Sequence, residues 1–172
     1  MEDSAQDLFD KQNNKNLKKI SREGLKYLYD KNILENTETF VRINSQKSEF
    51  YQHDVQTISS ILEKKSSIKG IFLPKVENYN QIKDCYDQLS TSKKNKFTIV
   101  PMIETEKGLK NLDKILLQDK FNDIIKYVHY GHYDFCLDSN FWPFPEPYHF
   151  EYWKIIEEIS KSVIKHKKKY IH

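Results

Sequence analysis

The sequence of 172 residues is poor in glycine and cysteine, and its charges nearly cancel. Its four glycines form no glycine-rich phosphate loop after an apolar run, which counts against a dinucleotide-binding fold. Its two cysteines, Cys85 and Cys136, match neither a metal-binding spacing nor a disulfide framework, so we expect free thiols in a reducing compartment. No apolar run reaches membrane-spanning length, and the first residues are acidic and polar, unlike a signal peptide. These absences favour a soluble, cytoplasmic protein.

The small net charge also limits the classes of partner. A formal charge of +3, with acids and bases interspersed, provides no basic stripe of the kind that binds nucleic acid. The one basic cluster, residues 165–169, is interpreted as a solvated helix end, where cations stabilise the helix dipole. An aromatic share of 13% argues against disorder. We therefore expect a folded domain, with no nucleic acid and no membrane as partner.

Short apolar runs alternate with segments whose apolar residues recur at helical spacing. The runs predict strands at 40–44, 70–74, 97–103 and 126–130, and the start of another at 170–172. The segments between them predict amphipathic helices, and a further helix precedes the first run and ends before Asn32.

Each strand and its helix occupy roughly 30 residues, the length of a βαβ repeat. Strands that are apolar on both faces are typical of a parallel sheet covered by helices. The class is therefore α/β. Periodicity alone leaves two architectures open, an open doubly wound sheet and a (β/α) barrel.

In parallel α/β proteins the functional site forms at the carboxyl ends of the strands. Polar residues occupy those positions in this sequence: Glu2, Asp3, Arg42, Asn44, Lys75, Glu77, Glu104, His132 and Asp134. Charges there are informative, because burial near the mouth of a barrel is costly unless each charge is paired or bound to a metal.

Two of these acids follow adjacent predicted strands. Glu104 and Asp134 are thereby placed to converge on one hard divalent cation, and magnesium takes one or two protein carboxylates with water and substrate oxygens completing its shell. Arg42 carries the planar fork that suits a substrate carboxylate. Each also has a plainer interpretation, Glu104 as a helix N-terminal acid and Arg42 as a structural ion-pair partner, and the residues alone leave both open.

Four motifs occur in an order and at a spacing that are typical of one enzyme family. They are Val41-Arg42-Ile43-Asn44, Leu73-Pro74-Lys75-Val76-Glu77, Ile103-Glu104-Thr105 and Gly131-x-x-Asp134. On these motifs the sequence resembles the citrate lyase β-subunit branch of the HpcH/HpaI aldolase family, which includes malyl-CoA and citramalyl-CoA lyases. The opening Met1-Glu2-Asp3-Ser4 resembles the acidic motif that ends the second barrel strand there.

The resemblance implies a (β/α)8 TIM barrel of the phosphoenolpyruvate/pyruvate-binding type, incomplete here, with strand 1 and strands 7–8 largely missing. Residues 1–172 are expected to form a single partial barrel domain. The implied activity is a magnesium-dependent carbon–carbon lyase or aldolase that cleaves a 3-hydroxy acid or its CoA thioester, with Mg2+ stabilising the negative charge that develops. The implied partners are a small keto or hydroxy acid, or an acyl-CoA. Unpaired sheet edges predict a homo-oligomer.

The resemblance also implies roles for individual residues. Glu104 and Asp134 are implied as ligands of Mg2+, and Arg42 as the residue that binds the substrate carboxylate. Glu77 and Gly131 are implied in substrate binding, Gly131 through the amides that follow it.

A second group has weaker motif support. Glu2, Asp3 and Lys75 are implied as a charged catalytic network on the barrel floor beside the substrate. His132 has no motif support and is interpreted as a loop residue.

The sequence departs from the family pattern in several places. A TIM barrel takes about 250 residues, the family's C-terminal lid has no counterpart, and the Asp-Leu-Gly continuation after Asp134 is replaced by Phe135 and then Asp138-Ser139. The aromatic and proline-rich segment Phe141–Pro147 does not follow from a lyase mechanism and is interpreted as a rigid packing loop. These departures leave an alternative open, a noncatalytic barrel fragment or assembly subunit that retains the site residues.

Overall fold

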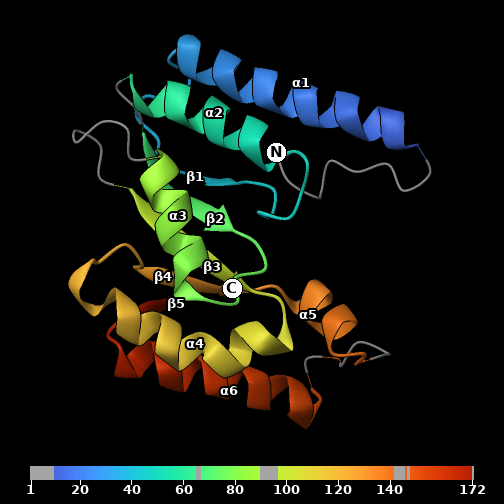
Figure 1. Cartoon of the computed structure of the whole chain (residues 1–172), viewed down its shortest axis with the longest axis vertical. Coiled ribbons are helices and arrows are strands. Elements are labelled where there is room, and N and C mark those ends of the chain that lie inside the picture. The colour runs from blue at the N-terminus through green and yellow to red at the C-terminus, as the bar shows by residue number, and fades with distance from the viewer. Residues whose placement is uncertain (1–9, 65–66, 90–96, 142–145, 147, 172) are drawn as a thin grey trace. The chain divides into compact units, whose positions relative to one another are not determined.

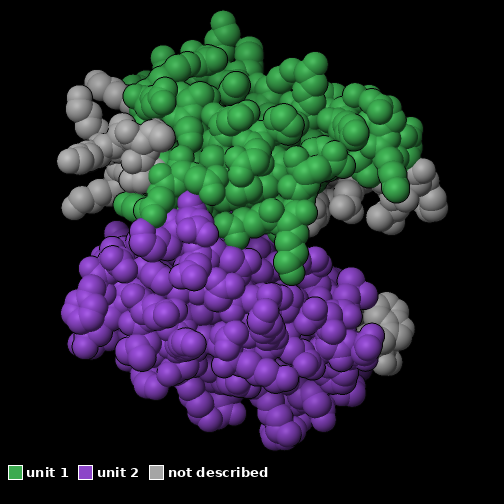
Figure 2. Space-filling model, viewed as in Figure 1, with its two compact units in different colours: residues 1–72, 85–97 green, residues 73–84, 98–172 purple. Residues whose placement is uncertain are grey.

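The computed structural model describes residues 10–64, 67–89, 97–141, 146 and 148–171. These residues belong to two compact units, one within 1–72 and 85–97 and the other within 73–84 and 98–172 (Figure 2). Each unit has its own parallel strands and its own covering helices (Figure 1).

The first unit is built on two parallel strands, β1 (Thr39–Arg42) and β2 (Ile68–Leu73), the last residue of which belongs to the second unit. Two helices, α1 (Lys11–Asp30) and α2 (Tyr51–Leu62), lie side by side in this unit (Figure 1). Helix α1 ends where Asn32 takes a left-handed backbone, with φ of 55°, which confirms the predicted end of this helix.

The second unit contains three parallel strands in chain order, β3 (Thr98–Ile103), β4 (Tyr127–Tyr130) and β5 (Lys169–Ile171). Helices α4 (Glu106–Gln118) and α6 (Phe150–Lys165) lie side by side along them (Figure 1). Every residue of β3 is buried, as expected for a parallel strand covered on both faces. Helix α3 (Tyr79–Leu89) begins in this unit and ends in the first.

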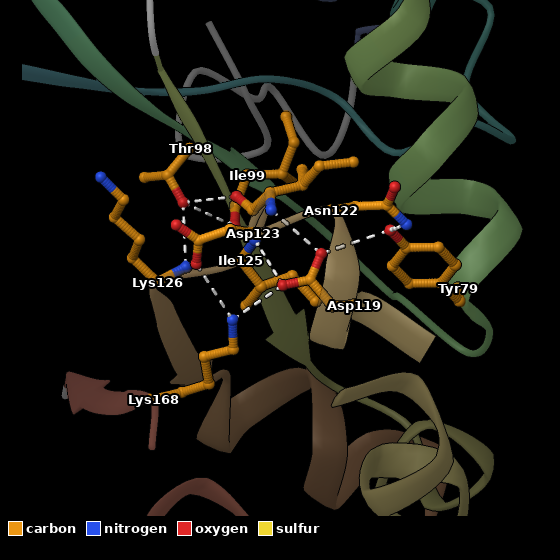
Figure 3. A network of polar contacts seen from close by, with 10 residues as sticks. Tyr79, Thr98, Ile99, Asp119, Asn122, Asp123, Ile125, Lys126 and Lys168 are labelled. Atoms are coloured by element: carbon orange, nitrogen blue, oxygen red, sulfur yellow. Dashed lines mark hydrogen bonds and ion pairs between the residues drawn. The ribbon is translucent and has the colours of Figure 1, made fainter. Parts of the chain in front are cut away.

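A buried carboxylate joins the segments that lead into β4 and β5 in the second unit. Asp119 begins the short 3-10 helix η1 (Asp119–Phe121) and is fully buried. It accepts hydrogen bonds from the backbone N–H of Ile124 and of Ile125, both at 3.0 Å, and pairs at 2.8 Å with Nζ of Lys168, the residue before β5 (Figure 3). The hydrogen bonds and the ion pair of this buried carboxylate hold the two segments together. The amino ends of these strands therefore have a role in stabilising the fold.

The strand predictions are confirmed to within two residues at each boundary that the structure describes, and the pairings β1–β2, β3–β4 and β4–β5 are parallel as predicted. Both cysteines are free and buried, which confirms the prediction of two free thiols. Among the described residues, none of the helices has the length and apolar character needed to cross a membrane.

One interpretation of the sequence was wrong. His132 was expected to lie in a loop, but it begins α5 (His132–Asp138), a helix of 7 residues directly after β4. Only Phe135 and Cys136 are buried in this helix. Two adjacent apolar residues give no i, i+3, i+4 pattern, so the periodicity of the sequence could not reveal the helix.

Candidate metal and substrate site

Glu104 and Gly131 lie together at the carboxyl ends of β3 and β4. The two strands pair in register at Ile103 and Tyr130, the residues just before them, and the N–H of Gly131 donates to the carbonyl of Ile103 at 3.0 Å. The side chain of Glu104 lies against Gly131 so closely that a Cβ atom there would stand 2.5 Å from Oε1 of Glu104. Only glycine fits at position 131 without displacing Glu104, because the Glu104 side chain occupies the space of a Cβ atom.

Lys75 contacts both acids that were predicted to bind metal. Its backbone N–H donates to Oε2 of Glu104 at 2.9 Å, and its Nζ lies 2.8 Å from Oδ1 of Asp134. Glu104 is buried, with 1% of its surface exposed, whereas the side chains of Lys75 and Asp134 are 41% and 32% exposed. We call Lys75, Glu104, Gly131 and Asp134 the strand-end cluster. The structure thus brings together four of the residues that the sequence singled out.

The amino terminus of α4 fixes the position of Glu104. Thr105 caps this helix by accepting the N–H of Gly108 at 3.0 Å, so the residue after Glu104 is held by its own side chain. The next amide, that of Glu106, donates at 2.9 Å to Oδ2 of Asp138 in α5. Since α5 also carries Asp134, this bond links the helix that contains Asp134 to the first turn of α4, which follows Glu104.

Asp138 was noticed in the sequence only as a departure from the family pattern. Its position four residues after Asp134 places both acids on one face of a helix, which is the one signal that the sequence contains. Without the helix assignment for 132–138 that signal could not be used.

The segment after β2 is held against α4. The N–H of Val76 donates to the carbonyl of Met102 at 3.3 Å, and a Cβ on Gly108 would lie 2.5 Å from the carbonyl oxygen of Val76. The first turn of α4 therefore packs directly on the backbone next to Lys75. This contact limits how far Lys75 can move from Glu104.

Glu77 lies in a different ion pair from the strand-end cluster. Its Oε2 is 3.0 Å from Nζ of Lys107, and its side chain is 16% exposed. Its amide donates to Oε1 of Gln81 at 2.7 Å and its carbonyl accepts from Nδ2 of Asn111 at 2.9 Å, so it links the start of α3 to α4. Its role in substrate binding stays a prediction.

Arg42 ends β1 and belongs to the first unit, whereas the strand-end cluster belongs to the second. The backbone after it is fixed by Asp54, a fully buried acid whose Oδ2 accepts the N–H of Asn44 at 2.8 Å and its Nδ2 at 2.6 Å. The other oxygen of Asp54 is 3.0 Å from Nη1 of Arg22 in α1. The role of Arg42 in carboxylate binding stays a prediction.

Other predictions concern residues that the structure does not describe. Glu2 and Asp3, the two acids assigned to the charged network, lie outside the described residues. So do residues 142–145 and 147, most of the aromatic and proline-rich segment.

The His132 and Cys136 side chains are close but unsuited to nucleophilic catalysis. Sγ of Cys136 is 3.9 Å from Nδ1 of His132. Burial raises the pKa of the Cys136 thiol, so the thiol stays protonated and weakly nucleophilic. The His132 ring packs edge-on against Tyr152, with 5.1 Å between the centroids. These contacts agree with a packing role for His132.

The strand-end cluster contains two carboxylates, those of Glu104 and Asp134. Within the described ranges, no group of three or more His, Cys, Asp and Glu side chains could hold a metal ion. Magnesium does not need three, because it binds one or two carboxylates and keeps several waters. Glu104 and Asp134 both contact Lys75, Glu104 through the backbone N–H and Asp134 through Nζ, so both carboxylates lie at the same end of the strands.

Parallel strands that alternate with helices define the class of the protein: it is an α/β protein. The chain belongs to the HpcH/HpaI aldolase/citrate lyase family, whose family model matches residues 8–160. This confirms the family and the fold class that the motifs implied. No curated protein matches the sequence.

Solved structures show the same fold at low sequence identity. RipC from Yersinia pestis matches with a TM-score of 0.68 and 12% identity, over 99% of this chain and 66% of that chain. CitE from Mycobacterium tuberculosis, in complex with magnesium and acetate, matches with a TM-score of 0.65 and 14% identity, over 100% and 63%. The same protein with magnesium, acetoacetate and coenzyme A matches at 0.66 and 14%, over 100% and 56%. The chain therefore spans less than two thirds of each of these relatives.

Proposed function

We propose that this protein is a magnesium-dependent carbon–carbon lyase or aldolase that acts on a 3-hydroxy acid or its CoA thioester. The observation that carries the proposal is the meeting of Glu104 and Asp134 on Lys75 at the carboxyl ends of the strands. Membership of the aldolase/citrate lyase family supports the reaction class. The likeness to CitE, solved with magnesium and acetate, with magnesium and pyruvate, and with magnesium, acetoacetate and coenzyme A, supports the metal and the kind of substrate.

The proposed reaction breaks the bond between carbons 2 and 3 of the substrate. The hydroxyl on carbon 3 loses its proton and becomes a carbonyl. Carbon 2 keeps the electron pair of the broken bond and takes up a proton. The products are a carbonyl compound, such as a keto acid, and a shorter acid or thioester, and the reverse reaction is an aldol addition.

Glu104 and Asp134 are the residues that would hold Mg2+. When bound, the ion would polarise the substrate oxygen and stabilise the negative charge that develops during cleavage. Glu104 is suited to this task because an ionised carboxylate with 1% of its surface exposed requires a cation or strong hydrogen bonds beside it. Gly131 leaves the space in which that carboxylate lies.

Other residues would hold the substrate. The planar guanidinium of Arg42 would bind its carboxylate through paired hydrogen bonds, as the resemblance of the segment Val41–Asn44 suggests. Glu77 and the amides after Gly131 would contact the same substrate, and Lys75, Glu2 and Asp3 would supply charge beside it. The substrate would be a small keto or hydroxy acid, free or as a CoA thioester, and the protein would act as a homo-oligomer.

Calorimetric titration with magnesium tests the metal site. Wild type should bind the ion, and Glu104→Gln and Asp134→Asn should each bind at least about tenfold more weakly, because each loses one charged ligand. Glu157→Gln is the matched control, since Glu157 is an exposed acid of α6 that pairs with Lys161. Equal affinity in all four proteins would contradict the proposal. Loss in both site variants, with no cleavage by wild type, would favour a noncatalytic member of the family.

A further inference from the structure

Lys75 has a backbone conformation that is unusual for a residue with a side chain. Its φ is 54°, in the left-handed region that favours glycine, and it directly follows Pro74. Such conformations persist only where the surroundings enforce them, and they concentrate at functional sites. Here the surroundings include the first turn of α4 against Val76 and the bond from the Lys75 amide to Glu104.

This conformation directs two donors of the same residue to the two acids. The N–H of Lys75 donates to Oε2 of Glu104 at 2.9 Å, while Nζ reaches Oδ1 of Asp134 at 2.8 Å. The amide donor carries no formal charge, and its position is fixed by the backbone. The ammonium contact is charged and is made by a flexible four-carbon side chain that is 41% exposed, so this side chain can move away from Asp134 into solvent.

We propose that Lys75 is an internal cation that competes with the divalent ion for Asp134 and thereby weakens and tunes metal affinity. The inference rests on the proposed function, because it requires the ion to bind Glu104 and Asp134. A magnesium ion binds a carboxylate oxygen at about 2.0–2.1 Å. An ammonium that stays on the same oxygen would lie within a few ångströms of the ion, where two cations repel strongly. Binding of the ion at Oδ1 of Asp134 would therefore displace the side chain of Lys75.

A positioning role for Lys75 predicts a change in magnesium affinity of the opposite sign. If the ammonium only held Asp134 in place for the metal, its removal would weaken magnesium binding. If it competes for Asp134, its removal strengthens binding. The sign of the change in affinity is therefore the test, and it does not depend on catalysis.

Calorimetric titration with magnesium chloride on Lys75→Met and Lys107→Met provides this test. Lys107 is the matched control, since it is a 67% exposed lysine of the same unit, its Nζ pairs with Glu77 at 3.0 Å, and its replacement removes the same charge. The dissociation constant of Lys75→Met should fall about tenfold, the size expected for losing one partly solvated like-charge contact. That of Lys107→Met should change less than about twofold, because exposed charges are screened.

A second variant protects the test against a folding defect. Lys75→Gly removes the ammonium and also relieves the left-handed backbone, so it should fold at least as well as wild type and should also bind magnesium more tightly. Unchanged or weaker binding in both variants would overturn the inference.

The outcomes separate this inference from the proposed function. If wild type binds magnesium and Glu104→Gln does not, but neither variant of Lys75 binds more tightly, Lys75 is not a competitor and the metal site stands. If neither wild type nor the Lys75 variants bind, the metal site is wrong and the inference falls with it. Binding by the Lys75 variants alone would support the inference and would contradict the magnesium binding by wild type that the proposed function requires.

Discussion

Adding one methyl group at three glycines should change stability in different directions. Gly24 lies inside α1, and a Cβ built on it meets no atom within 4 Å. A Cβ on Gly108 would lie 2.5 Å from the carbonyl oxygen of Val76, and one on Gly131 would lie 2.5 Å from Oε1 of Glu104. The same substitution to alanine therefore probes open solvent, a backbone contact and the candidate metal ligand.

The magnitudes follow from these surroundings. Gly24→Ala should stabilise the protein by about 0.5–1 kcal/mol, because glycine inside a helix loses more chain entropy on folding than alanine does. Gly108→Ala should destabilise it by about 1–3 kcal/mol, since a backbone carbonyl cannot move aside without shifting the loop. Gly131→Ala should cost a similar amount, roughly 1–3 kcal/mol, because the carboxylate that has to move is buried.

Of the two destabilising substitutions, only Gly131→Ala displaces Glu104, the candidate metal ligand. Gly131→Ala should also weaken magnesium binding by at least about tenfold, because Glu104 has to leave its position and an ionic contact is steeply distance-dependent. Gly24→Ala should leave the affinity unchanged.

Urea denaturation at pH 7 measures the free energies of unfolding, and the thermal midpoint provides a second reading, with about 2–4 °C expected per kcal/mol for a chain of this size. A Gly131→Ala protein as stable as wild type would show that the Glu104 side chain does not occupy that space. A Gly24→Ala protein destabilised as much as Gly108→Ala would refute the reasoning as a whole.

Substitutions at three further acids, Asp119, Asp138 and Asp113, test individual contacts. Asp119→Ala should cost about 3–5 kcal/mol in urea denaturation, because it removes the buried carboxylate that accepts from two backbone amides and pairs with Lys168; Asp123→Asn, at a position 76% exposed, should cost less than about 1 kcal/mol. Asp138→Ala should weaken magnesium binding, and Asp138→Asn should restore most of it, because an amide oxygen still accepts the Glu106 N–H. The pKa of Asp113 is lowered from 3.8, chiefly by the hydrogen bond from Lys165. The stability advantage of wild type over Asp113→Asn should therefore be complete at pH 7 and should vanish as the pH falls below 3.8 in an acid-unfolding series.

The strands could be predicted because their burial follows from continuous runs of apolar residues. The run at 97–103 is apolar on both faces, and it forms β3 at Thr98–Ile103 with every residue buried. The closeness of Glu104 and Gly131 follows from the same pattern, since parallel neighbouring strands end at the same edge of a sheet. The sequence was therefore a good guide wherever position along a strand decides position in space.

The remaining features depend on conformations that no periodicity encodes. The double contact of Lys75 requires a left-handed residue after Pro74, and the motif that contains it does not specify that conformation. Asp119 lies outside the strands, and its partners include two backbone amides, which are present in every sequence and therefore give no signal. Helix α5 was missed because its two buried residues are adjacent. In each case the decisive interaction lies in a connection between elements.

The most direct test of the proposed function is cleavage of a panel of free 3-hydroxy acids and 3-hydroxyacyl-CoA esters, with the released carbonyl product identified by mass spectrometry. Wild type should cleave at least one member of the panel with magnesium present, should lose this activity in excess chelator, and should regain it when the ion is restored. Glu104→Gln should be inactive under all three conditions, because it lacks a charged ligand for the ion. Failure to cleave any member, or cleavage that persists in chelator or in Glu104→Gln, would contradict the proposal of a magnesium-dependent carbon–carbon lyase at the strand-end cluster.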